Sequence, residues 1–122
     1  GIATLGQGAT KNTFLEEVMP VELKGDKEIV RCEPPATIEW ATEKLDDPGV
    51  VLWRHDVAAR DQAEIVATAG GNPLVVRDHY GEGLVFVFTG TVLGDEQANP
   101  DAFWRKSAWN KALEFMVLSK VD

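Results

Sequence analysis

Residues 74–88 constrain the fold more than any other part of the sequence. They hold two runs rich in β-branched and aromatic residues, 74–80 and 84–88, joined by Gly81-Glu82-Gly83. Two such runs with a short glycine turn between them are typical of a β-hairpin. The second run is apolar at odd and even positions alike, so we expect both faces of this strand to be covered.

Other short segments bounded by turn residues predict further strands. These strands are expected over residues 2–5, 21–23, 28–32, 50–53 and 63–68. A Thr-x-x-Glu capping box at Thr13 predicts a short helix over residues 14–19, which Pro20 ends. Pro34-Pro35 interrupts the strand pattern, and residues 38–41 form too short a segment to assign.

The clearest helix signal lies near the C-terminal end. Asn99-Pro100-Asp101 supplies an N-cap, a proline in the first turn and an acid at the positive end of the helix. Apolar residues then recur at three- and four-residue spacing. They are Phe103, Trp104, Ala108, Trp109, Ala112, Leu113, Met116 and Val117. We therefore predict a long amphipathic helix over residues 100–118 that packs on the sheet, with Arg105, Lys106 and Lys111 on its solvent side.

Composition narrows the class of protein. The 122 residues fit one domain, and 12 basic against 20 acidic side chains give a net charge of −8. That charge disfavours binding to nucleic acid, which attracts basic patches. The longest apolar run, 83–88, is far shorter than the roughly 20 residues of a membrane span, so we expect no membrane insertion. One cysteine excludes a disulfide framework within the chain. No charged leader precedes residues 2–5, so we expect no signal peptide in this sequence.

Cys32 is the one candidate thiol nucleophile. A nucleophile elbow needs small residues around the reactive side chain, but Cys32 lies between Arg31 and Glu33 and directly before Pro34-Pro35. Arg31 would lower the pKa of the thiol and Glu33 would oppose that effect. We therefore interpret Cys32 as a strand residue and assign no nucleophile.

The two histidines and the acids select no catalytic or metal site. His55 precedes Asp56 and His79 follows Asp78, but neighbours along a strand point to opposite faces, so neither pair converges. The acids considered for a hydrolytic pair are Glu43, Asp46, Asp47, Asp56, Asp61, Glu64, Asp95 and Glu96. Nothing in their spacing selects two of them. We assign no catalytic, cofactor-binding or metal-ligating residue and expect no cofactor.

Several stretches resemble, in order, class I glutamine amidotransferase-like domains. Residues 12–23 resemble the T-x-L-E-E-V-L-P-V segment of these domains, many of which accompany von Willebrand A domains or occur in uncharacterised bacterial surface proteins. Residues 63–67, 73–76 and 80–90 resemble the closing P-L-L-V-x-x-x-Y-G-x-G-R-V-x-x-F-T hairpin. Phe103-Trp104 and Trp109 resemble the aromatic last helix.

The resemblance implies an α/β fold, part of a flavodoxin-like sandwich with a mainly antiparallel hairpin region and a long C-terminal helix. It also implies that residues 1–122 are one domain, an excised C-terminal portion of a larger one. The strand–helix units that carry the cysteine elbow in the family would precede Ile2. Leu84 stands where the family has arginine, and a His-x-Glu motif is absent near the C-terminus. No catalytic residue is therefore carried over.

These observations favour a non-catalytic binding or scaffold domain of a larger bacterial protein, with its ligand unspecified. A hydrolase of sugars or amides, using acids and a histidine such as His55 or His79, is the first alternative. An interaction module that uses an exposed strand edge is the second. Expected partners are other domains of the parent protein or a second copy of the chain. The sequence leaves the compartment open, an envelope-associated parent protein included.

Overall fold

The computed structural model describes residues 14–24, 29–41, 44–92 and 99–119. In chain order the elements are α1 (Phe14–Val18), β1 (Val21–Leu23), β2 (Val30–Trp40), β3 (Val50–Arg54), β4 (Val57–Ala59), β5 (Glu64–Ala69), β6 (Asn72–Tyr80), β7 (Gly83–Phe88), the 3-10 turn η1 (Phe103–Arg105) and α2 (Ser107–Leu118). The expected strand over residues 2–5 and the cap at Thr13 lie outside the described residues. No helix in the described part of the chain is long and apolar enough to cross a membrane.

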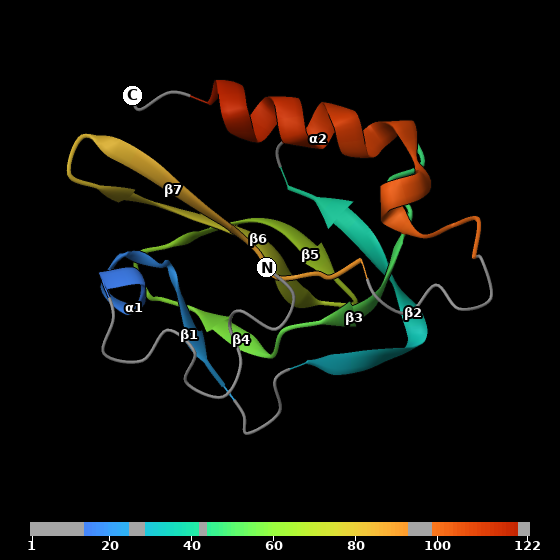
Figure 1. Ribbon diagram of the computed structural model, residues 1–122, viewed down its shortest axis with the longest axis horizontal. Helices are drawn as coiled ribbons and strands as arrows, with labels where there is room; N and C mark the ends of the chain where they lie inside the picture. Colours follow the sequence, from blue (N-terminus) through green and yellow to red (C-terminus); the bar gives the residue numbers. More distant parts are fainter. Residues whose placement is uncertain (1–13, 25–28, 42–43, 93–98, 120–122) are drawn as a thin grey trace.

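The main sheet has five strands in the order β3-β2-β5-β6-β7, and every neighbouring pair is antiparallel. It curls into a half-barrel, with α2 along one side and the separate β1-β4 pair on the other (Figure 1). The prediction of a flavodoxin-like α/β sandwich is therefore wrong. Such a sandwich needs parallel strands joined by crossovers of a dozen or more residues. The connections from β2 to β3, from β5 to β6 and from β6 to β7 are too short for that.

The hairpin prediction is confirmed. Strands β6 and β7 pair from Val75 opposite Phe88 to Tyr80 opposite Gly83. Gly81 in the turn has φ +60°, a conformation that side chains with a Cβ rarely adopt. Side chains of β7 pack on both faces, as expected: Phe88 joins the cluster under α2, whereas Val87 joins a second cluster with residues of β1 and β4.

The long strand β2 departs from the prediction, which placed a break at Pro34-Pro35. Arg31 pairs with Trp53 and Ala36 pairs with Val51, so residues 32–35 all stand opposite the single residue Leu52. A proline has no N–H to donate to a ladder and is tolerated where a bulge releases the strand from pairing. The strand therefore continues past the prolines, and residues 38–40 pair with β5.

The C-terminal helix is shorter than predicted. Residues 103–105 form η1, Lys106 is extended with φ −95° and ψ 144°, and α2 begins only at Ser107. Because this break interrupts the helical period, the apolar residues from 103 to 117 do not share one stripe. Ala108 and Ala112 are buried as expected, but Leu113 is 40% exposed and Val117 is 79% exposed.

The chain after β7 covers the outer edge of β3 and so closes the curl. The N–H of His55 donates to the carbonyl of Thr89 at 2.7 Å, and the N–H of Thr91 donates to Trp53 at 3.0 Å. Further along, the N–H of Val50 donates to the carbonyl of Asp101 at 2.8 Å. Thr89 also donates from its hydroxyl to the carbonyl of Pro73 at 2.7 Å, so the end of β3 lies beside the start of β6. We call this end of the curled sheet the mouth of the half-barrel.

Candidate functional site

A groove of about 610 Å³ opens at this mouth. The bulge of β2 forms one wall through residues 31–37, and the turn at residues 70–72 between β5 and β6 forms another. Arg54, the last residue of β3, and Glu39 of β2 complete the lining. A smaller cavity of about 340 Å³ lies against the same bulge and reaches Leu52 and Trp53. The bulge is thus a wall with hollows on both sides.

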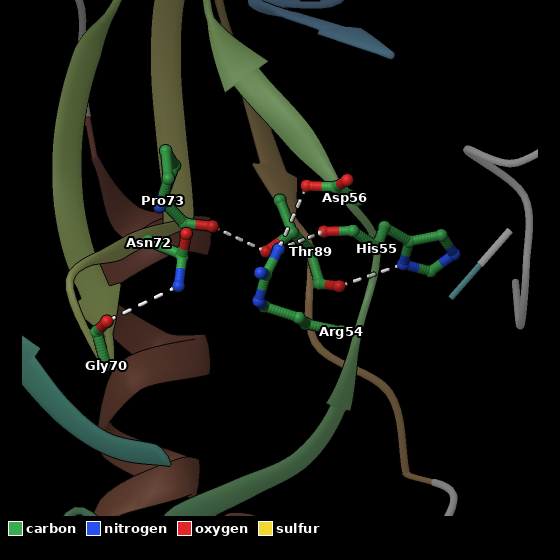
Figure 2. A network of polar contacts seen from close by, with 7 residues as sticks. All are labelled: Arg54, His55, Asp56, Gly70, Asn72, Pro73 and Thr89. Carbon is green, nitrogen blue, oxygen red and sulfur yellow. Dashed lines mark hydrogen bonds and ion pairs between the residues drawn. The ribbon is translucent and has the colours of Figure 1, made fainter. Parts of the chain in front are cut away.

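Arg54 is the most constrained charged side chain of the groove. Only 15% of its side chain is exposed. Its Nη1 donates to Asp56 Oδ1 and to the carbonyl of His55, both at 3.4 Å, as Figure 2 shows. Both distances are long for hydrogen bonds donated by a guanidinium. Within the described residues, the Nε and Nη2 groups of Arg54 donate to no protein atom.

The polar groups around Arg54 hold the turn and the strand ends in place. Asn72 Nδ2 donates to the carbonyl of Gly70 at 3.3 Å, and Thr89 Oγ1 donates to the carbonyl of Pro73 at 2.7 Å. Figure 2 shows the Arg54 guanidinium on the side of the network that faces Asn72 and Gly70. The groove therefore has a framework fixed by backbone carbonyls.

Cys32 lies at the bulge and contributes to the lining of the groove. Its side chain also belongs to the hydrophobic cluster under α2. Burial raises the pKa of the Cys32 thiol, although the charge of Arg54 and a hydrogen bond from the backbone of Ala36 act to lower it. A thiol with a raised pKa is a poor nucleophile at neutral pH.

The hydrogen bonds that the structure gives for the two histidines do not involve Cys32. His55 is 2% exposed, and its Nδ1 lies 2.8 Å from the carbonyl oxygen of Thr89. Because a carbonyl only accepts, Nδ1 carries the hydrogen, and Nε2 has no hydrogen-bond partner among the residues that the structure describes. His79 is exposed near the hairpin turn, where its own backbone N–H donates to Asp78 Oδ1 at 2.8 Å.

The acids considered from the sequence are dispersed. Three of them form ion pairs: Asp47 with Lys106 at 2.9 Å, Asp56 with Arg54 at 3.4 Å, and Glu64 with Arg77 at 2.7 Å. Asp46 and Asp61 are exposed, and Glu43, Asp95 and Glu96 lie outside the described residues. Within the described ranges, no three His, Cys, Asp or Glu side chains gather in a metal-binding group.

Sequence reasoning missed Arg54 and the groove. The available signals were an Arg-His-Asp run directly after the buried segment 50–53 and a Pro-Pro pair inside a β-rich stretch. Neither signal indicates a groove until the partner strands are known. The register of β2 against β3 and the closure at Thr89 are contacts between residues far apart in the sequence.

The fold and the groove define a curled antiparallel half-barrel with one helix along it. No family model matches the sequence. No curated protein matches it either.

Two solved structures share the fold. The cytoplasmic protein STM3548 from Salmonella typhimurium superposes with a TM-score of 0.68 and 25% identity, over 88% of this chain and 47% of that one. The cytoplasmic protein STM1381 from Salmonella typhimurium LT2 gives 0.60 and 19%, over 90% and 52%. The chain spans about half the length of each.

Proposed function

We propose that this chain is a non-catalytic binding domain that acts as part of a larger protein and takes its ligand in the groove beside Arg54. The observation that carries the proposal is the position of Arg54 in a groove at the mouth of the curled sheet. Its side chain is only 15% exposed, and its Nε and Nη2 donate to no atom of the described residues. Barrel mouths are common places for ligand sites, and few, well-placed polar groups are typical of them.

The surroundings of Cys32 and His55 argue against catalysis in this groove. Acyl transfer to a thiol needs a thiolate or a base within hydrogen-bond reach of the thiol. Burial raises the pKa of Cys32, and the Nδ1 of His55 is engaged by Thr89. In the described part of the chain, neither residue forms a hydrogen bond or ion pair with the other. A binding role needs no such pair.

One observation supports a larger parent protein. The two similar Salmonella structures come from chains about twice as long as the segment that matches. The amidotransferase-like relationship stays a prediction, based on the hairpin segment 80–90 and on Phe103-Trp104. The reading frame upstream of Ile2 would test it, because members of that family carry their cysteine elbow in a strand–helix unit at that place.

Turnover assays test the absence of catalysis. Incubation of the chain with glutamine, asparagine and model glycosides should release neither ammonia nor sugar above the level of buffer. A Cys32→Ala variant and a His55→Asn variant are assayed in parallel to show whether any release depends on these side chains. Release by the wild-type chain that disappears in either variant would overturn the proposal and restore the hydrolase alternative.

The outer edge of β7 favours a second candidate function, an interaction module. The N–H of Thr89 donates to the carbonyl of Leu74 at 2.8 Å. In an antiparallel pair every second residue bonds to the partner strand, so this bond shows which residues of β7 bond to β6. The backbone groups of Leu84 and Phe86 then point away from β6, and no described strand pairs with them. The edge of β3, in contrast, is covered by residues 90 and 102.

An open edge of this kind pairs with a strand from another chain. Light scattering tests the simplest case, in which the partner is a second copy. A dimer that becomes monomeric in Leu84→Pro would support this function, because that proline removes an outward N–H and leaves the ladder with β6 intact. A monomeric wild-type chain would contradict pairing between copies.

A further inference from the structure

We propose that the groove binds a carboxylate group, and that the Nε and Nη2 edge of Arg54 receives its two oxygens. The inference rests on the proposed binding function and names the chemical class of the ligand. It does not depend on the amidotransferase-like relationship or on the β7 edge.

The hydrogen-bond geometry of Arg54 leaves one side of the guanidinium open. Nη1 is committed to Asp56 and to the carbonyl of His55. The remaining Nε and Nη2 donors lie parallel in the plane of the guanidinium, the arrangement that matches a carboxylate in two-point contact. Among the described residues the only buried side-chain nitrogen or oxygen without a partner is His55 Nε2, so solvent reaches the Nε and Nη2 edge of Arg54 and a ligand carboxylate can reach it as well.

The position of Arg54 adds to this case. Because most of its side chain is covered, binding would immobilise little additional chain. Asn72 also lines the groove. Its amide donates one hydrogen to the carbonyl of Gly70 at 3.3 Å and has a second hydrogen to donate. The volume of about 610 Å³ is in the range of small-molecule sites, roughly 300–1,000 Å³.

The charges of the lining favour a carboxylate over a phosphate. Arg31 pairs with Glu33 at 3.2 Å on the exposed rim, so Arg31 adds little free positive charge. Glu39 lines the groove and is exposed. Two carboxylates in the same groove repel a dianion more strongly than a monoanion. The ligand is therefore a small organic acid or the terminal carboxylate of a peptide.

NMR of the ¹⁵N-labelled chain tests the inference through the Arg54 side-chain Nε–H signal. The probes are acetate, N-acetylglycine, N-acetylglycinamide and inorganic phosphate. We expect the signal to shift and saturate with the two acids, and not with the uncharged amide. Tighter saturation by acetate indicates a free organic acid, and tighter saturation by N-acetylglycine indicates a peptide terminus. A shift that does not saturate with either acid, or equal shifts with acid and amide, would overturn the inference, as would tighter saturation by phosphate.

Matched variants separate the open edge from charge alone. Arg54→Lys keeps the charge but removes the two-point edge, and we expect it to weaken binding of the acids about tenfold or more. Arg77→Lys alters an arginine that pairs with Glu64 and does not line the groove, so we expect unchanged affinity. Equal affinity of Arg54→Lys and wild type would contradict the inference. If Arg54→Lys does not give a folded amide spectrum, the comparison of acid with amide on the wild-type chain decides.

The two proposals fail in different experiments. Loss of the acid response with no turnover of amides or glycosides would reject the carboxylate and leave the non-catalytic assignment in place. Turnover that depends on Cys32 or His55 would reject the proposed function, whatever the NMR response of Arg54.

Discussion

The carbonyl oxygen of Thr89 accepts two hydrogen bonds from His55, one from the backbone N–H at 2.7 Å and one from ring Nδ1 at 2.8 Å. This double contact joins the residue after β7 to the residue after β3. It sets Arg54 opposite Gly90 as an isolated bridge and so fixes the open end of the curled sheet. The position of the groove arginine therefore depends on a contact between residues 34 positions apart.

Replacing His55 tests how much this contact contributes to the free energy of unfolding. His55→Phe removes the side-chain hydrogen bond and puts a larger ring at a position that is 2% exposed, so we expect a loss of about 1–3 kcal/mol in the free energy of unfolding. Urea denaturation followed by tryptophan fluorescence measures it. His79→Phe is the control, because an exposed substitution is expected to change stability by less than about 0.5 kcal/mol. Equal stability of the two variants would contradict a structural role for the His55 ring.

Gly49 is the tightest point between the sheet and the segment that leads to α2. It has φ +87°, and a Cβ there would lie 2.8 Å from both the carbonyl oxygen of Asp101 and the Cα of Phe103. We expect Gly49→Ala to cost more than about 2 kcal/mol, because a backbone clash adds to the strain of a left-handed residue. Gly71→Ala, with φ +82° and open space around it, isolates the strain alone at about 1–2 kcal/mol. Similar unfolding free energies for both would show that the close approach is absent.

The thiol of Cys32 should react slowly in the folded chain. Burial raises its pKa above the ordinary value of 9.0, so less thiolate is present near pH 8 than in the unfolded chain. Alkylation by iodoacetamide measures this, with the urea-unfolded chain as reference. The unfolded thiol ionises first as pH rises, so the contribution of Cys32 to stability is complete below pH 9 and is lost above it. Faster alkylation of the native chain than of the unfolded one would contradict this environment.

Lys106 should make stability depend on pH in the alkaline range. Hydrogen bonds to Asp47 at 2.9 Å and to Asp101 at 3.2 Å raise its pKa above 10.5. A raised pKa gives a stabilising contribution that is complete below pH 10.5 and is lost as pH rises through the folded value. In a Cys32→Ala background, adding Lys106→Met should flatten the decline in thermal midpoint above that pH. An unchanged slope would exclude Lys106 as its source.

The parts of the fold that the sequence predicted are those with local signals. The hairpin at Gly81 carries its own turn chemistry, and β1 lies at the expected residues 21–23. The order of the strands and the curl of the sheet have no such signal, because they depend on pairings such as Arg54 with Gly90. The predicted helix over residues 100–118 is confirmed only from Ser107 to Leu118, because the hydrogen bond from Val50 to Asp101 holds the start of the predicted segment against β3.

The candidate site was less accessible to sequence reasoning than the strands. A histidine, a cysteine and scattered acids are recognised as candidates by residue type alone, and these were considered. Arg54 is notable only because its partners leave one edge of the guanidinium open, and those partners are known only from the fold. The role of Pro34-Pro35 as a groove wall likewise depends on the register of β2 against β3.

We propose above that the mouth of the half-barrel is a binding groove organised around Arg54. A crystal structure of the chain grown or soaked with sodium acetate tests it most directly. We expect a carboxylate in the groove with its two oxygens on Nε and Nη2 of Arg54, while Nη1 keeps its contact with Asp56. A groove without acetate, or an Arg54 edge occupied by a protein carboxylate, would contradict the claim.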